Sequence, residues 1–252
     1  SIYSDLCHAQ GRWSEALAHA LKNIELVSQQ QTAMPFFHYS SKILWQSGRF
    51  EMARHYLEQV DSNSKQEAYH FGGYWHTLWL IDVADFYVAW QQPEQALFYS
   101  QLANKNAQKL GRKDLLGRAL KTEGASQLQL EQLDAATENL TEARQILHDE
   151  MASDYECTAL NHLIHLHLAL EDHTQVATYT QLLWEQLHSG KLDMINAEPI
   201  KAWWACYLGF LALGDSRADN ALQTACEMFQ TQLAFIDDEQ WRIDFSTNIP
   251  EH

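Results

Sequence analysis

The chain has 252 residues, of which 46% are hydrophobic, and its 33 Asp and Glu outnumber its 17 Lys and Arg, giving a formal net charge of −16 at pH 7. This surplus of acids disfavours attraction to the phosphates of nucleic acids and to anionic lipid. With only 10 Gly and 4 Pro, little interrupts the Ala-, Leu-, Gln- and Glu-rich stretches that favour helix. We therefore expect one all-α domain over residues 1–252 that binds neither nucleic acid nor a membrane.

Helical periodicity divides the chain into segments separated by short polar or Gly-containing turns. In chain order, the predicted helices span 2–9, 13–29, 34–46, 50–60, 67–91, 94–110, 114–130, 134–149, 153–171, 174–189, 198–213, 217–235 and 239–246. The first helix lacks a beginning, so we expect a fragment of a longer protein with a truncated N-terminal repeat. The last segment, 236–252, is expected to cap the final repeat.

An alanine recurs just inside every second helix, about every forty residues. The clearest copies are Gly-Arg-Trp-Ser-Glu-Ala, ending at Ala16, and Gly-Arg-Phe-Glu-Met-Ala, ending at Ala53; weaker copies end at Ala96, Ala136, Ala177 and Ala221. Such a period is typical of a solenoid, in which each helical hairpin buries its apolar face only by stacking on its neighbours. The pattern predicts about six hairpins in a right-handed α-α superhelix.

Small residues also stand seven positions before the turns of the first four repeats, at Ser4, Ser41, Ala84 and Gly124. There they would let the two helices of a hairpin approach closely. Repeats five and six carry His165 and Tyr207 instead, so either these repeats are wider or the register changes.

A small residue in the first helix, a Gly-x-aromatic turn and a small residue in the second helix together resemble the tetratricopeptide repeat family. The sequence Leu-Gly-Asp-Ser-Arg-Ala at 213–218 and the ending Asn-Ile-Pro-Glu-His at 248–252 look like the C-terminal end of large bacterial signalling ATPases or transcriptional regulators. The resemblance implies a regulatory repeat array attached to ATPase or effector domains. The chain has no Gly-x-x-x-x-Gly-Lys-Ser/Thr phosphate loop of its own.

Neither metal binding nor catalysis is expected. His162 and His165 lie on one helix face, but no third or fourth ligand has a spacing that would converge on them. Cys157 near His162 lacks an orienting carboxylate and an oxyanion-binding glycine loop. We therefore interpret these residues as structural and predict a protein that is not an enzyme and needs no cofactor.

If the first helices line the inner face of the superhelix, counting back from each turn predicts which side chains face the groove. The candidate ligand-binding residues are His38, Lys42, Trp45, Asp85, Arg118, Lys121, His162, Lys201 and Trp204. Four of these are cations and one is an acid, so the groove is expected to be less negative than the rest of the protein. This composition favours an acidic peptide, with aromatic side chains supplying most of the affinity.

Two functions remain open at this point. The first is a non-catalytic scaffold for protein interaction or regulatory sensing; the second is a sensor that binds a small inducer such as a sugar. A polar pocket with tryptophan walls would favour the sensor, and an open shallow groove would favour a peptide. Self-association through an uncapped terminal repeat is a further possibility.

The setting is expected to be cytoplasmic. The four cysteines lack Cys-x-x-Cys spacing, no run of 18 apolar residues occurs, and no basic-then-apolar leader precedes the first helix.

Overall fold

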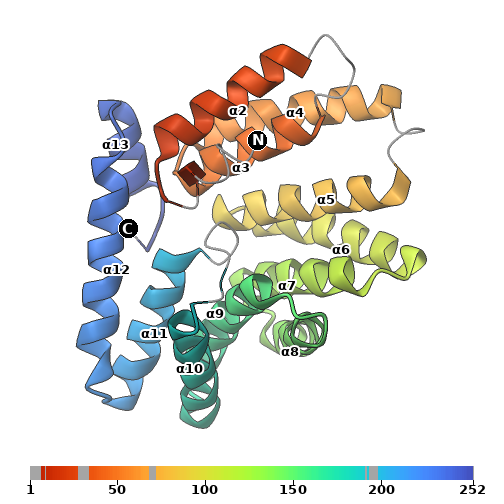
Figure 1. Ribbon diagram of the computed structural model, residues 1–252. Coiled ribbons are helices and arrows are strands. Elements are labelled where there is room, and N and C mark those ends of the chain that lie inside the picture. The colour runs from red at the N-terminus through yellow and green to blue at the C-terminus, as the bar shows by residue number, and fades with distance from the viewer. Residues whose placement is uncertain are drawn as a thin grey trace.

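The computed structural model describes residues 7–8, 10–27, 34–67, 72–190, 192 and 198–251. These residues form helices and no strand, and neighbouring helices pack in sequence order (Figure 1), which confirms the predicted all-α solenoid. The helices are α2 (Trp13–Val27), α3 (Met34–Gln46), α4 (Phe50–Glu67), α5 (Gly72–Ala89), α6 (Pro93–Leu110), α7 (Lys113–Gln129), α8 (Leu133–Asp149), α9 (Ser153–Ala169), α10 (His173–His188), α11 (Pro199–Leu213), α12 (Arg217–Ala234) and α13 (Glu239–Thr247). None of the described helices is long and apolar enough to cross a bilayer.

The repeat is visible in the turn that joins the two helices of each hairpin. One residue per turn has a positive φ, and these residues are Gly11, Gly48, Gln91, Glu131, Glu171 and Gly214. Non-glycine residues adopt this left-handed conformation at a cost of about 1–2 kcal/mol. Because three of the six turns tolerate Gln or Glu there, glycine alone was an incomplete marker of the repeat.

The buried small residue of the second helix follows the left-handed residue by five positions in the first four repeats. Ala16, Ala53, Ala96 and Ala136 are all fully buried there. In the fifth repeat the buried residue is Val176, whereas the predicted Ala177 is exposed. The predicted register of this repeat was therefore wrong by one residue, because two adjacent apolar residues fit the pattern equally well.

The predicted register of the first helix of the fifth repeat was also wrong by one residue. Ile164, which is fully buried, stands seven residues before the left-handed Glu171, and His165 is only half-buried. In the fourth repeat the prediction holds: a Cβ on Gly124 would lie 2.6 Å from Cγ of Leu140 in the partner helix. Close approach therefore requires glycine at this crossing.

Two adjacent helix boundaries were predicted wrongly, namely the end of the helix 50–60 and the start of the helix 67–91. The polar sequence at 61–64 was expected to end a helix, but α4 continues to Glu67 and α5 begins at Gly72. Asp, Ser and Asn each disfavour helix by only about 0.7 kcal/mol or less relative to Ala, so a helix that is already formed continues through them. The remaining boundaries lie within a few residues of the predicted ones.

The two ends of the solenoid meet. Figure 1 shows α12 and α13 beside α2, and the hydrophobic core of the first repeats includes Trp241, Phe245 and Ile249 from the C-terminal segment. Phe245 is fully buried, with its ring centroid 5.5 Å from that of Phe229 and 6.2 Å from that of Trp13. The segment 236–251, here called the clasp, therefore covers the first hairpins as well as following the last one.

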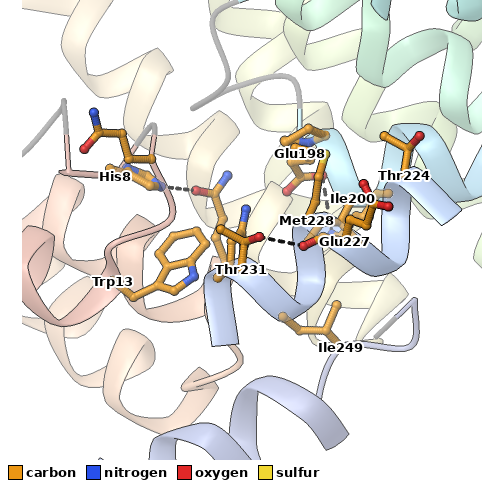
Figure 2. A pocket seen from close by; sticks show the side chains of 14 residues that line it. His8, Trp13, Glu198, Ile200, Thr224, Glu227, Met228, Thr231 and Ile249 are labelled. Atoms are coloured by element: carbon orange, nitrogen blue, oxygen red, sulfur yellow. Dashed lines mark hydrogen bonds and ion pairs between the residues drawn. The ribbon is translucent and has the colours of Figure 1, made fainter. Parts of the chain in front are cut away.

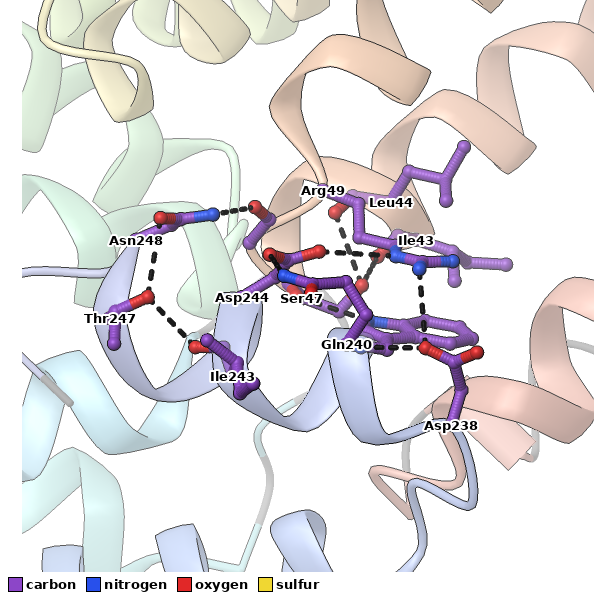
Figure 3. A network of polar contacts seen from close by, with 12 residues as sticks. Ile43, Leu44, Ser47, Arg49, Asp238, Gln240, Ile243, Asp244, Thr247 and Asn248 are labelled. Atoms are coloured by element: carbon purple, nitrogen blue, oxygen red, sulfur yellow. Dashed lines mark hydrogen bonds and ion pairs between the residues drawn. The ribbon is translucent and has the colours of Figure 1, made fainter.

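Polar contacts fix the clasp to the turn between α3 and α4 (Figure 3). The indole Nε1 of Trp241 donates to the carbonyl oxygen of Ser47 at 3.2 Å, and Nδ2 of Asn248 donates to that of Gly48 at 2.9 Å. The guanidinium of Arg49 pairs with Asp238 at 3.3 Å and with a second clasp carboxylate, Asp244, at 3.4 Å. Buried carbonyl oxygens of the turn thereby gain the donors that they need.

The described start of the N-terminal repeat, at which self-association was considered possible, is buried. Within the predicted helix 2–9, only residues 7 and 8 are described; Cys7 and His8 are 1% and 3% exposed. Trp13, at the start of α2, is 6% exposed. The other residues of the predicted helix, 2–6 and 9, lie outside the described part, so self-association stays a prediction.

Gly48 provides a test of this closure. It has φ +81°, and a Cβ there would lie 2.5 Å from the carbonyl oxygen of Asp244, a backbone atom that cannot turn aside. We expect Gly48→Ala to cost clearly more stability than Gly214→Ala, since Gly214 has φ +65° with nothing within 4 Å of the added methyl and costs only the backbone strain of about 1–2 kcal/mol. Urea unfolding and hydrogen exchange of 238–248 measure both effects; equal losses and unchanged exchange would contradict clasp docking at this turn.

Candidate functional site

The hollow side of the closed solenoid contains a cavity of about 330 Å³, here called the central cavity. Its walls come mainly from α3, α5, α7, α9 and α11, which are the first helices of their hairpins, and from the end of the clasp. Six of the nine predicted groove residues line it: Lys42, Trp45, Asp85, Lys121, His162 and Lys201. Stacking places them together because every first helix presents the same face inward.

The other three predicted residues lie elsewhere or outside the described part. The Arg118 guanidinium lies 4.2 Å from the ring centroid of Tyr155 and pairs with Asp82 at 3.4 Å, in the wall behind the cavity. Trp204 is half-buried, with its ring 5.1 Å from that of Tyr207, and does not line the cavity. His38 belongs to α3, but its side chain lies outside the described residues.

Sequence reasoning missed two carboxylates of the cavity, Glu198 and Glu251. Counting back from the repeat turns could not find them, because Glu198 lies just before the first turn of α11 and Glu251 lies in the clasp. Glu198 is the N-cap residue of α11, with φ 45° and ψ 65°, directly before Pro199. A left-handed non-glycine residue outside the hairpin turns stores about 1–3 kcal/mol of strain, which structures keep most often at functional sites.

Two lysines of the cavity already form ion pairs with carboxylates of the fold. Nζ of Lys121 donates to Oδ1 of Asp85 at 2.8 Å, and the Thr122 hydroxyl donates to the same oxygen at 2.5 Å. Burial opposes the ionisation of Asp85, but Lys121, Thr122 and Arg118 together outweigh it and hold the Asp85 pKa below its ordinary value. Nζ of Lys201 lies 3.4 Å from Oε2 of Glu198.

The lining is formally neutral. It contains three lysines and three carboxylates, namely Lys42, Lys121 and Lys201 together with Asp85, Glu198 and Glu251. Burial, followed by the charge of Lys121, lowers the His162 pKa to about 3, and burial also lowers the pKa of His165. Both imidazoles are therefore uncharged at pH 7. The cavity is much less negative than the whole chain, which carries a net charge of −16.

Two observations concern metal binding and nucleophilic catalysis. No group of three or more His, Cys, Asp or Glu suited to a metal ion occurs among the described residues. Cys157 is fully buried, and burial raises its pKa well above that of an ordinary thiol. The thiolate form that nucleophilic catalysis needs is therefore disfavoured.

A second pocket of about 340 Å³ adjoins the central cavity, and Gln46, Glu198, Lys201 and Ile249 line both. Figure 2 shows it between the start of α2 and α12, with Trp13, Ile200 and Met228 among its apolar walls. Nε2 of His8 lies 2.7 Å from Oε1 of Gln46. Burial lowers the His8 pKa to about 3, so this pocket also contains a neutral imidazole.

The fold and the site together define an α-helical repeat solenoid whose ends meet around a polar cavity. No family model matches the chain, and no curated protein matches its sequence. A solved structure with a similar fold is BtubC (BKLC) from P. vanneervenii, with a TM-score of 0.61 and 16% sequence identity over 88% of this chain and 92% of that one. At this identity the likeness shows the fold alone.

Proposed function

We propose that this chain is a non-catalytic regulatory module of the tetratricopeptide type, part of a larger bacterial signalling protein, that senses a small ligand in the central cavity. The observation that carries the proposal is the double role of the clasp. Trp241 and Asn248 fasten it to the first repeats, and Ile249, Pro250 and Glu251 at its end line the cavity. Occupancy of the cavity and closure of the solenoid therefore involve the same segment.

The size of the cavity and the ion pairs in its wall favour a small molecule over a peptide. A volume of about 330 Å³ lies at the lower end of the range of about 300–1,000 Å³ for small-molecule sites. An acidic peptide would also have to compete with Asp85 for Lys121 and with Glu198 for Lys201. The ion pairs thus remove much of the cationic character on which the acidic-peptide hypothesis depended.

Ligand binding would stabilise the closed solenoid by mass action. A ligand that contacts both the clasp and the first helices binds only when the clasp is docked, so it shifts the population toward the closed form. At a concentration of 100 times its Kd, such a ligand contributes about 2.7 kcal/mol. That is enough to change the exposure of the clasp to attached domains, and this change is the proposed signal.

The charge states in the cavity and the reduced cysteines both agree with the proposal. The cavity combines neutral histidines with paired lysines and carboxylates, an arrangement suited to recognition rather than to proton transfer near pH 7. The four cysteines are thiols rather than disulfides, as expected for a protein of the reducing cytoplasm.

The proposal can be tested with a metabolite fraction of bacterial extract from which macromolecules have been removed. We expect it to raise the melting temperature of the protein and to slow hydrogen exchange in 238–248. Val88→Trp, which places an indole in the cavity, should abolish both effects. Leu211→Trp is the matched control because Leu211 is 56% exposed and lies outside the cavity. Stabilisation by the protein fraction alone, or undiminished stabilisation of Val88→Trp, would favour a protein scaffold instead.

A further inference from the structure

Three buried hydrogen-bond acceptors of the central cavity have no donor among the described residues. They are Oε1 of Gln129, Oδ1 of Asn161 and Oε2 of Glu251. Asn161 is only 5% exposed, so bulk water does not solvate it freely. A buried acceptor left unsatisfied costs about 1–3 kcal/mol, so the three acceptors of this cavity require donors from water or from a ligand.

Neighbouring residues show which atoms of Gln129 and Glu251 are left without a partner. Nε2 of Gln129 donates to the carbonyl oxygen of Val88 at 2.9 Å, so the amide oxygen is the atom left over for a ligand. Glu251 lies near Lys201 and His165. However, the ammonium group of Lys201 pairs with Glu198, and His165 is neutral because burial lowers its pKa. The Glu251 carboxylate therefore forms no ion pair with another described residue of the cavity.

Two lysines of the cavity, in contrast, already have acceptors. Lys121 donates to Asp85, and Lys201 pairs with Glu198. A ligand that brings donors would satisfy the three acceptors, and a positively charged donor would also pair with the Glu251 carboxylate. A protonated primary amine has three N–H donors and no acceptor on its nitrogen. A neutral polyol would satisfy the two amide oxygens but would leave the Glu251 charge without a partner.

We propose that the central cavity binds a small primary amine, whose ammonium group is held by Gln129, Asn161 and Glu251. The carbon skeleton of the ligand would extend toward the adjoining pocket, where Trp13, Ile200 and Met228 offer apolar surface. This inference rests on the proposed function, since it names the class of ligand that the sensor recognises. Because Glu251 belongs to the clasp, the amine bridges the clasp to α7 and α9.

Calorimetric titration with three probes of equal length tests the proposal: hexylamine, hexan-1-ol and hexanoate, at physiological salt. We expect hexylamine alone to bind measurably. Glu251→Gln and Asn161→Leu should each weaken it by about tenfold or more, because the first removes the negative charge of an acceptor and the second removes a hydrogen bond to a charged group. Asn161→Asp should instead tighten it, a gain that a merely destabilised protein would not show.

Glu239→Gln is the matched control, since Glu239 is an exposed carboxylate of the same segment and its loss changes the net charge equally. Equal weakening by Glu239→Gln and Glu251→Gln would mean unspecific attraction of the amine to an acidic protein and would overturn the proposal. Binding of the alcohol or the acid in place of the amine would also overturn it. In that case the proposed function would stand, provided that the metabolite fraction still protects the clasp from exchange.

Discussion

Phe245→Ala is expected to lower the free energy of unfolding by about 3–5 kcal/mol, the usual cost of truncating a fully buried aromatic side chain. Phe245 is 0% exposed and lies between Phe229 of α12 and Trp13 of α2. Its removal leaves a void where the two ends of the solenoid meet. The loss should therefore be accompanied by opening of the closed form, seen as an increased radius of gyration in X-ray scattering.

Ile243→Ala is the control for this prediction. Ile243 lies two residues earlier along α13 and is 46% exposed, so its truncation should change stability by no more than about 0.5 kcal/mol. Urea unfolding of both variants makes the comparison. Similar losses for the two variants, with an unchanged radius of gyration, would show that the clasp does not hold the ends together.

Asp85→Leu is expected to cost about 3–5 kcal/mol because it leaves the Lys121 ammonium buried without its partner. The Lys121 side chain is 7% exposed, and its Nζ lies 2.8 Å from Oδ1 of Asp85. Removing both charges in Asp85→Leu/Lys121→Met should recover most of the loss, since a buried ion pair replaced by apolar residues is often neutral or stabilising. No recovery in the double variant would mean that Asp85 stabilises the fold through other contacts, such as Thr122.

The same pair predicts how stability depends on pH. The Asp85 pKa is lowered in the folded protein because Lys121, together with Thr122 and Arg118, outweighs the effect of burial. Its contribution is therefore fully present above the unfolded pKa of about 3.9 and is lost as the pH falls through the lower folded value. Wild-type protein should lose more stability on acidification through this range than Asp85→Leu/Lys121→Met does, as measured by urea unfolding at each pH.

Counting positions back from each repeat turn predicted a large part of the candidate site. Lys42, Asp85, Lys121 and Lys201 come from four different hairpins, yet their positions before each turn placed all of them on the cavity wall. The same counting overestimated the positive charge of the site, because it omitted Glu198 and Glu251. Neither residue occupies a repeat position, so no periodic pattern contains them.

The predicted register of the fifth repeat was wrong because two adjacent residues fitted the repeat pattern equally well. Val176 and Ala177 are adjacent apolar residues, and only packing against the neighbouring helices shows that Val176 is the buried one. The extension of α4 through 61–64 has a similar origin, because weak local preferences do not end a helix that its hydrogen bonds already sustain. The assignment to tetratricopeptide repeats and to a bacterial signalling parent remains a prediction.

The sequence by itself determined the helical hairpins, their order and the inward face of the first helices, because these depend on periodicity and on stacking between neighbours in the chain. Only the tertiary structure decided that the solenoid closes and that carboxylates neutralise the cations of its cavity. Contacts such as Trp241 with Ser47 and Asn248 with Gly48 join residues almost 200 positions apart. They depend on the accumulated curvature of all the repeats, which no single repeat encodes.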